Sequence, residues 1–129
     1  MKTVWVNGCF DVLHRGHIEL FKYAKSLGDY LVVGLDTDQR VKRAKGISRP
    51  FNKLQDRMAM LEAIKYIDAV VSFDDDDELR YLVKFYNSDI MVVGSDWRDK
   101  RVVGQDAVKE VKFFSRIGEY STTKILEST

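Results

Sequence analysis

The sequence is poor in the features that mark secreted, membrane-inserted and nucleic-acid-binding proteins. Its single cysteine, Cys9, cannot form an internal disulfide, which fits a reducing compartment. The 21 Lys and Arg are balanced by 20 Asp and Glu, so the chain lacks the basic excess of a general nucleic-acid binder. No apolar run approaches the roughly 20 residues that span a bilayer, and the N-terminus lacks the apolar core of a signal peptide. We expect a cytoplasmic protein with no nucleic-acid partner and no membrane insertion.

What the sequence does contain is enough apolar material for one folded domain. It has 129 residues, of which 45% are hydrophobic. Short apolar runs alternate with segments of helical periodicity. We expect helices at residues 17–28, 53–67, 74–86 and the start of 107–114, and strands at 3–8, 29–35, 68–73, 89–94 and the end of 107–114. The sequence therefore predicts a single domain over residues 1–129.

This alternation of strands and helices predicts an α/β fold. The expected architecture is a doubly wound, Rossmann-like, five-stranded parallel sheet with helices on both faces, in which loops at the carboxyl ends of the strands form the site. Residues 36–52 are polar and basic, contain the only proline, and are expected to form a long loop. The acidic run 74–77 is typical of a solvated helix start, because four consecutive side chains cannot converge on one metal ion.

One short stretch stands out at the end of the first predicted strand. Residues 7–17 read NGCFDVLHRGH and contain both histidines of the chain, His14 and His17. Gly8 and Gly16 let the backbone approach a ligand closely, and the N–H groups at a helix N-terminus bind phosphate well. Alternatively, one histidine could cap the helix while the other faces solvent. Two histidines on a glycine turn favour a phosphate site. A zinc site is disfavoured because Cys9 is the only further ligand nearby.

Two separated motifs resemble those of a known superfamily. The segment GCFDVLHRGH resembles the HxGH signature of nucleotidyltransferases, in their cytidylyltransferase-like branch. The tail RIGEYSTTKI, residues 116–125, resembles the second signature of that branch, an arginine followed by Ser-Thr-Thr. The segments RPFNKLQDRM, KYIDAVV and VVGSDWRDK lie between them in the expected order. The resemblance covers nearly the whole chain.

The resemblance implies a reaction between a nucleoside triphosphate and a phosphorylated small molecule. The acceptor phosphate attacks the α-phosphorus and pyrophosphate leaves, with no covalent enzyme intermediate. Such a transfer depends on positioning and on electrostatic stabilisation of phosphoryl charge. Mg²⁺ is expected to arrive with the triphosphate, and no dedicated carboxylate cage is evident. Residues 65–71 resemble a dimer-forming segment, which implies a homodimer.

The same resemblance, with the glycine turn, selects the candidate site residues. The catalytic residues implied are His14, His17, Arg116 and Lys45. The nucleotide-binding residues implied are Gly8, Cys9, Phe10, Gly16, Lys42, Asp96, Trp97, Ser121, Thr122 and Thr123. The acceptor-binding residues implied are Asp11 and Arg57. No metal ligand is implied.

Several of these residues also have simpler structural interpretations. Lys42 and Lys45 could belong to a solvated basic loop, and which of them contacts phosphate stays open. Arg57 could pair with a neighbouring acid on the surface, and Asp11 could be purely structural. Trp97 could be a core aromatic, and the Ser-Thr-Thr tail could be only a helix cap.

The substrates follow less directly, because the chain combines the patterns of two branches. Arg116 and the Asp96–Trp97 pair resemble glycerol-3-phosphate cytidylyltransferases. The loop KGISRPFN, residues 45–52, and the stretch 102–104 resemble heptose-phosphate adenylyltransferase domains. The sequence favours CTP with glycerol 3-phosphate, and the alternative is ATP with a heptose phosphate. A non-catalytic nucleotide sensor on the same scaffold is the alternative of another class, and pyrophosphate release distinguishes it from an enzyme.

Overall fold

The computed structural model describes residues 1–98 and 100–115, and its strands form one parallel sheet. The strands are β1 (Thr3–Gly8), β2 (Tyr30–Asp36), β3 (Ala69–Phe73), β4 (Ile90–Gly94) and β5 (Glu110–Phe114). They are ordered β3-β2-β1-β4-β5. Each neighbouring pair is parallel. The predicted doubly wound sheet is therefore confirmed, and the chain changes direction across the sheet between β1 and β4. In such folds a crevice for ligands opens at that point, beyond the carboxyl ends of the strands.

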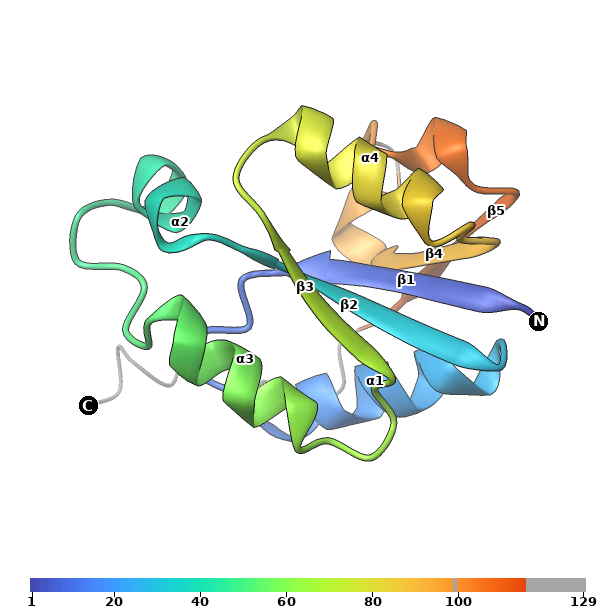
Figure 1. Ribbon diagram of the computed structural model, residues 1–129, viewed down its shortest axis with the longest axis horizontal. Coiled ribbons are helices and arrows are strands. Elements are labelled where there is room, and N and C mark those ends of the chain that lie inside the picture. Colours follow the sequence, from blue (N-terminus) through green and yellow to red (C-terminus); the bar gives the residue numbers. More distant parts are fainter. Residues whose placement is uncertain (99, 116–129) are drawn as a thin grey trace.

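Helices cover both faces of the sheet, as the sequence predicts. The α-helices are α1 (Arg15–Ser26), α2 (Asp38–Lys45), α3 (Leu54–Glu62) and α4 (Asp76–Phe85), and two 3₁₀ turns follow, η1 (Ser95–Trp97) and η2 (Gln105–Ala107). Helices α1 and α3 lie on one side of the sheet, and α4 lies on the other (Figure 1). Two hydrophobic clusters result, one on each face.

Strand β1 shows how the alternating side chains build both clusters. Val4 and Val6 belong to the cluster with α1, while Trp5 between them belongs to the cluster with α4. All three are buried. Trp5 pairs with Val32 on β2, and its ring extends over Gly34 of the same strand, where an added Cβ would lie 2.6 Å from Cζ2 of Trp5. The glycine on β2 therefore leaves room for the largest side chain of the central strand.

The structure differs from the sequence-based expectation in the segment after β2. Residues 38–45 form helix α2, where a long loop was predicted. Thr37 caps this helix by accepting from the backbone N–H of Arg40, and Gly46 ends it with a φ of 101°. Only Val41 is buried, so the helix lacks the apolar face by which the other helices were predicted. Helix α3 is also shorter than expected and ends at Glu62.

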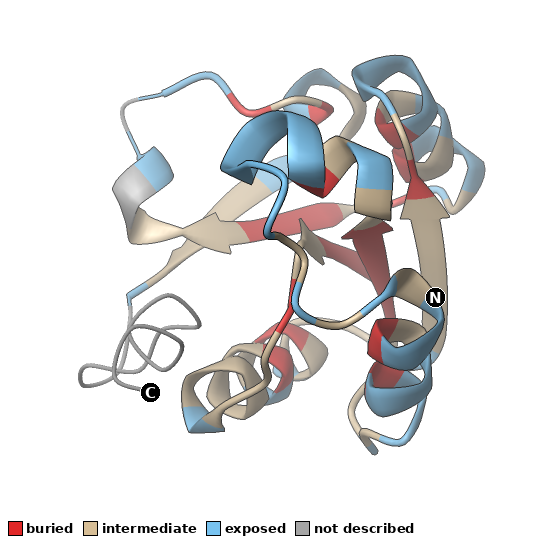
Figure 2. Ribbon diagram, turned by 90° about the vertical axis from the view of Figure 1, so that its left-hand side faces the viewer, coloured by how far each residue is buried: buried red, intermediate tan, exposed pale blue. Residues whose placement is uncertain are grey.

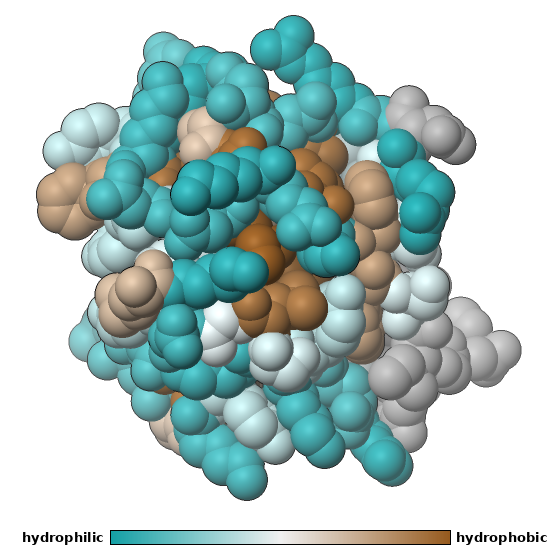
Figure 3. All heavy atoms as spheres, turned by 90° about the vertical axis from the view of Figure 1, so that its right-hand side faces the viewer, coloured by the Kyte–Doolittle hydropathy of each residue, from teal (hydrophilic) through white to brown (hydrophobic). Residues whose placement is uncertain are grey.

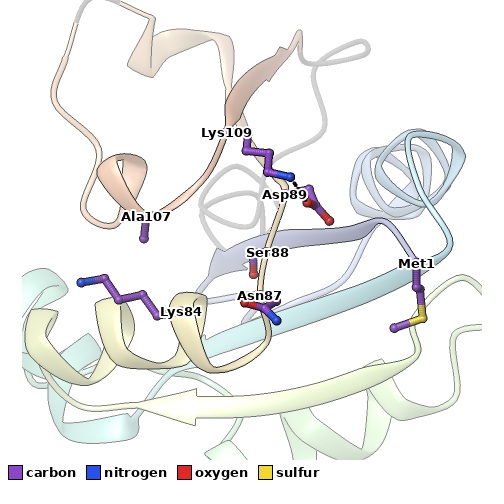
Figure 4. A pocket seen from close by; sticks show the side chains of 7 residues that line it. All are labelled: Met1, Lys84, Asn87, Ser88, Asp89, Ala107 and Lys109. Atoms are coloured by element: carbon purple, nitrogen blue, oxygen red, sulfur yellow. Dashed lines mark ion pairs between the residues drawn. The ribbon is translucent and has the colours of Figure 1, made fainter.

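The two edges of the sheet have different surroundings. The carboxyl edge faces the viewer in Figure 2, with α2 above the ends of the strands. The amino edge, seen in Figure 3, has a hydrophobic patch surrounded by hydrophilic side chains. A pocket of about 490 Å³ also lies at the amino edge, and Ser88, Asp89 and Lys109 are among its lining residues (Figure 4). In the described part of the chain, no helix has the length and hydrophobicity to cross a membrane.

Candidate active site

The loop from β1 to α1 places both histidines at the N-terminus of α1. His14 is the N-cap, and its Nδ1 accepts a hydrogen bond from the backbone N–H of Gly16 at 3.1 Å. The Nδ1 of His17 accepts in turn from the backbone N–H of His14 at 3.2 Å. The two side chains thus form a reciprocal capping box, so capping is shared by both histidines. Because Nδ1 is the acceptor in each ring, each neutral imidazole carries its proton on Nε2.

The two imidazoles are held as a stacked pair. Their ring centroids are 3.9 Å apart with an interplanar angle of 26°. Phe10 packs edge-on against His17, with centroids 5.4 Å apart, and also contacts Phe21. With His14 as its N-cap, helix α1 begins at Arg15, two residues before the predicted start at His17. The pair presents two donors of fixed tautomer beside the backbone N–H groups of a helix terminus, which suits a phosphate.

Phe10 supports this pair from a strained backbone position. Its φ is 47°, in the left-handed region that few residues other than glycine adopt, and its side chain is buried. A Cβ at Gly8 would lie 3.1 Å from Cζ of Phe10, so glycine leaves room for the ring. The sequence selected Phe10 for nucleotide binding, whereas its side chain packs under His17 in the interior.

Asp11 anchors a distant loop to this turn. Its carboxylate accepts from the backbone N–H groups of Phe51 and Asn52, each at 2.7 Å. It also accepts from Nε of Arg49 at 3.2 Å. Asp11 is only 3% exposed. Its contacts therefore favour the structural interpretation over the predicted acceptor contact.

Arg57 is a second anchor of the same region. It is 1% exposed and donates to the carbonyl oxygens of Cys9, Asp36 and Asn52. Its Nη2 donates to Oδ1 of Asp38 at 2.7 Å. The guanidinium thus joins the ends of β1 and β2 to the loop before α3. The alternative of a surface ion pair is therefore wrong, because burial directs the donors to backbone carbonyls and Asp38. The acceptor contact of Arg57 stays a prediction.

Cys9 belongs to the histidine turn, and one basic residue of α2, Lys45, lies near it. Burial raises the pKa of the Cys9 thiol, although Lys45 and Arg57 act to lower it, so the thiol remains protonated at neutral pH. The influence of Lys45 on Cys9 places a cation of α2 near the glycine turn. Arg43 instead donates to the backbone oxygen of Asp74, on the loop before α4.

The predicted Asp96–Trp97 pair follows the end of β4, the strand beside β1 in the sheet. Asp96 and Trp97 belong to η1, which follows β4 directly. Trp97 is 45% exposed, so the core interpretation is wrong and its ring is accessible for stacking. Lys100 places its Nζ 5.5 Å from the centroid of that ring. The remaining predicted site residues, Arg116 and Ser121 to Thr123, lie outside the described residues.

Two contributors to the site were not selected from the sequence. Asp38 holds Arg57, and Arg49 pairs with Asp11. Each contact joins residues from different elements that are far apart in the sequence, so no local spacing marks it. Within residues 1–98 and 100–115, no group of three or more His, Cys, Asp or Glu could hold a metal ion.

Comparison with known proteins decides the family. A sequence model described as cytidylyltransferase-like matches residues 5–128. The chain belongs to the cytidylyltransferase-like family. This places it among the nucleotidyltransferases, as its HxGH and Ser-Thr-Thr motifs predicted.

The relatives of this chain include HldE proteins and a solved lipopolysaccharide core biosynthesis protein. The bifunctional protein HldE of Campylobacter fetus is 48% identical over 123 residues, which are 95% of this chain and 27% of HldE. The Helicobacter hepaticus HldE is 45% identical over 127 residues, 98% of this chain and 26% of HldE. The chain thus spans about a quarter of the length of these curated relatives. A solved lipopolysaccharide core biosynthesis protein from Thermoplasma volcanium is 27% identical, with a TM-score of 0.71, over 94% of this chain and 99% of that one.

Proposed function

We propose that the chain is an adenylyltransferase domain that transfers AMP from ATP to a heptose phosphate or a closely related sugar phosphate. The observation that carries this proposal is the loop 45–52, KGISRPFN, which resembles heptose-phosphate adenylyltransferases. Its residues Arg49, Phe51 and Asn52 contact Asp11 on the histidine loop. The similarity to HldE proteins supports the same branch. The sequence alone favoured CTP and glycerol 3-phosphate, and the relatives favour the alternative.

In the proposed reaction, the side chains position phosphates and offset charge. A phosphate oxygen of the acceptor attacks the α-phosphorus of ATP, the bond from that phosphorus to the bridging oxygen breaks, and pyrophosphate leaves. The Nε2–H groups of His14 and His17 donate to oxygens on which negative charge develops. The backbone N–H groups at the start of α1 add a positive electrostatic potential. Lys45, the basic residue that influences Cys9, neutralises a further phosphate.

The rest of the proposed machinery comes from the sequence pattern. Trp97 stacks on the base, and Asp96 lies beside it. Arg116 contributes a further cation, and Ser121 to Thr123 contribute hydroxyl and N–H donors. Mg²⁺ would be held mainly by the triphosphate, because the buried Asp11 carboxylate is committed to the loop 49–52. The single domain over residues 1–129, the cytoplasmic location and the homodimer through residues 65–71 stay predictions, and sedimentation velocity tests the last.

Pyrophosphate release tests the function directly. The assay crosses ATP and CTP with a heptose phosphate and glycerol 3-phosphate, in the presence of Mg²⁺. Turnover only with ATP and the heptose phosphate is expected. Turnover with CTP and glycerol 3-phosphate would assign the chain to the glycerol-3-phosphate cytidylyltransferase branch, which its Asp96–Trp97 pair resembles. Nucleotide binding without pyrophosphate release, with every combination of nucleotide and acceptor, would support the non-catalytic nucleotide sensor.

A further inference from the structure

Arg49 has a donor that no residue of the described part of the chain uses. Its side chain is 15% exposed, and its Nε pairs with Asp11. Its Nη2 is buried and has no hydrogen-bond partner among residues 1–98 and 100–115. Buried polar groups are almost always hydrogen-bonded, and an exception calls for a specific explanation. Here the exception lies on the loop that contacts the histidine turn.

A second arginine of the same region shows that the fold can satisfy a buried guanidinium here. Arg57 is more deeply buried than Arg49, yet its Nε, Nη1 and Nη2 all donate hydrogen bonds, to backbone carbonyls and Asp38. The Nη2 of Arg49 has no such partner in the described part of the chain. Two other buried atoms, Nε of Arg80 and Oγ of Ser88, also lack a partner there, but neither lies on the loops of the histidine turn.

Asp11 holds Arg49 in a defined orientation beside the proposed site. The carboxylate is itself held by the N–H groups of Phe51 and Asn52, and it accepts from Nε of Arg49 at 3.2 Å. Asp11 precedes His14 on the same loop, which carries the phosphate-binding N-terminus of α1. The negative charge of Asp11 is directed at donors of the loop 49–52. The planar guanidinium matches the geometry of a phosphate group.

We infer that Arg49 binds a phosphate group of one of the two substrates, through its Nη2 and with Asp11 as its positioning residue. This inference rests on the proposed function, because it takes the phosphates of that reaction as its ligands. It adds a substrate-binding residue that the sequence motifs do not identify. The phosphate belongs either to the acceptor or to the nucleotide, and separate titrations distinguish them.

The test compares Arg49→Gln and Arg49→Lys with Arg43→Gln, which removes a charge from the neighbouring helix outside the site. Isothermal titration measures binding of ATP and of the sugar phosphate separately, steady-state kinetics gives KM for each, and thermal unfolding reports folding. Arg49→Gln should weaken one ligand by about 10- to 100-fold, as expected for a lost charge-assisted hydrogen bond. Arg49→Lys should recover part of the affinity, and Arg43→Gln should leave both ligands unchanged.

The outcomes separate this inference from the proposed function. A selective loss for the sugar phosphate assigns the acceptor, and a selective loss for ATP assigns the nucleotide. If the wild type binds these ligands without releasing pyrophosphate, the proposed function fails, while a loss in Arg49→Gln still supports the inference. Unchanged affinities in folded Arg49→Gln and Arg49→Lys would overturn it and leave Arg49 a structural residue. A wild type that binds neither ligand would overturn both.

Discussion

The two edges of the sheet use aspartates in the same way but in opposite environments. At the amino edge, Asp89 accepts from the backbone N–H of Thr3, and Asp68 accepts from that of Leu31. Both also pair with lysines, and both remain partly exposed. At the carboxyl edge, Asp11 is buried and accepts from the loop 49–52.

This difference teaches where the fold carries its energetic costs. The amino-edge aspartates have partners and face solvent, so their contacts only connect strands to loops. The amino edge also has a residue with positive φ, Asn87, and an unpartnered buried hydroxyl, Ser88 Oγ. What sets the carboxyl edge apart is the buried charge of Asp11 beside the stacked histidines, together with Phe10 at positive φ and an Nη2 of Arg49 without a partner in the described part of the chain. Strained and unmatched groups often mark functional sites. The pocket in Figure 4 lies at the other edge, away from these residues.

The largest difference in stability is expected when a buried cation of the carboxyl edge and an exposed cation of the amino edge are each removed. Arg57→Met at the carboxyl edge should lower the free energy of unfolding by about 3 to 5 kcal/mol, because Asp38 and three carbonyls lose a buried donor. Lys109→Met, at the exposed ion pair with Asp89, should change it by less than about 1 kcal/mol. Urea denaturation of both variants measures the contrast. Equal losses would show that burial does not distinguish the two edges.

The next effect separates capping from catalysis. His14→Ala and His17→Ala should each reduce turnover by about 100- to 1,000-fold, because a donor to the developing phosphoryl charge is lost. Each should cost only about 1 kcal/mol of stability through the lost cap. Asp75→Ala removes the cap of α4 and serves as the control, with a similar loss of stability and near-normal turnover. Near-normal turnover in both histidine variants would contradict their proposed role.

The smallest effect concerns acid stability at the amino edge. The backbone N–H of Thr3 and then Lys109 hold the pKa of Asp89 below its ordinary value. Partial burial acts to raise the pKa of Asp68, but hydrogen bonds from Lys25 and Leu31 outweigh it and lower the pKa. Folded-state pKa values below the unfolded ones stabilise the protein above the ordinary carboxyl pKa. That stability is lost as the pH falls through the folded values, between about pH 5 and 2.

The double variant that carries both Asp68→Asn and Asp89→Asn tests this pH dependence. It should be less stable than the wild type at pH 7 and should lose less further stability on acidification. Urea midpoints measured from pH 7 to pH 3 test this. Parallel pH profiles for the two proteins would rule out these aspartates as the source.

Helix α2 shows what local patterns could and could not predict. Its signals were present, with Thr37 before an acidic first turn, three basic residues in the last turn, and Gly46 after it. They were outweighed by the lack of an apolar face, because Val41 alone is buried. Helix α4 has both a capping signal and an apolar face, with Leu79 and Val83 buried. Its predicted start in the acidic run is confirmed by the cap at Asp75.

Apart from α2, the sequence by itself determined the alternation of strands and helices, the parallel sheet and the position of both histidines at the start of α1. Periodicity and caps are local properties, and the handedness of parallel crossovers leaves few arrangements. Only the tertiary structure decided that Asp11, Arg49 and Arg57 meet behind the histidine turn. Such contacts join residues far apart in sequence, and they arise because adjacent parallel strands bring their following loops to one edge. Burial directs every donor group of Arg57 to partners of the fold, whereas the Nη2 of Arg49 has no hydrogen-bond partner in the described part of the chain.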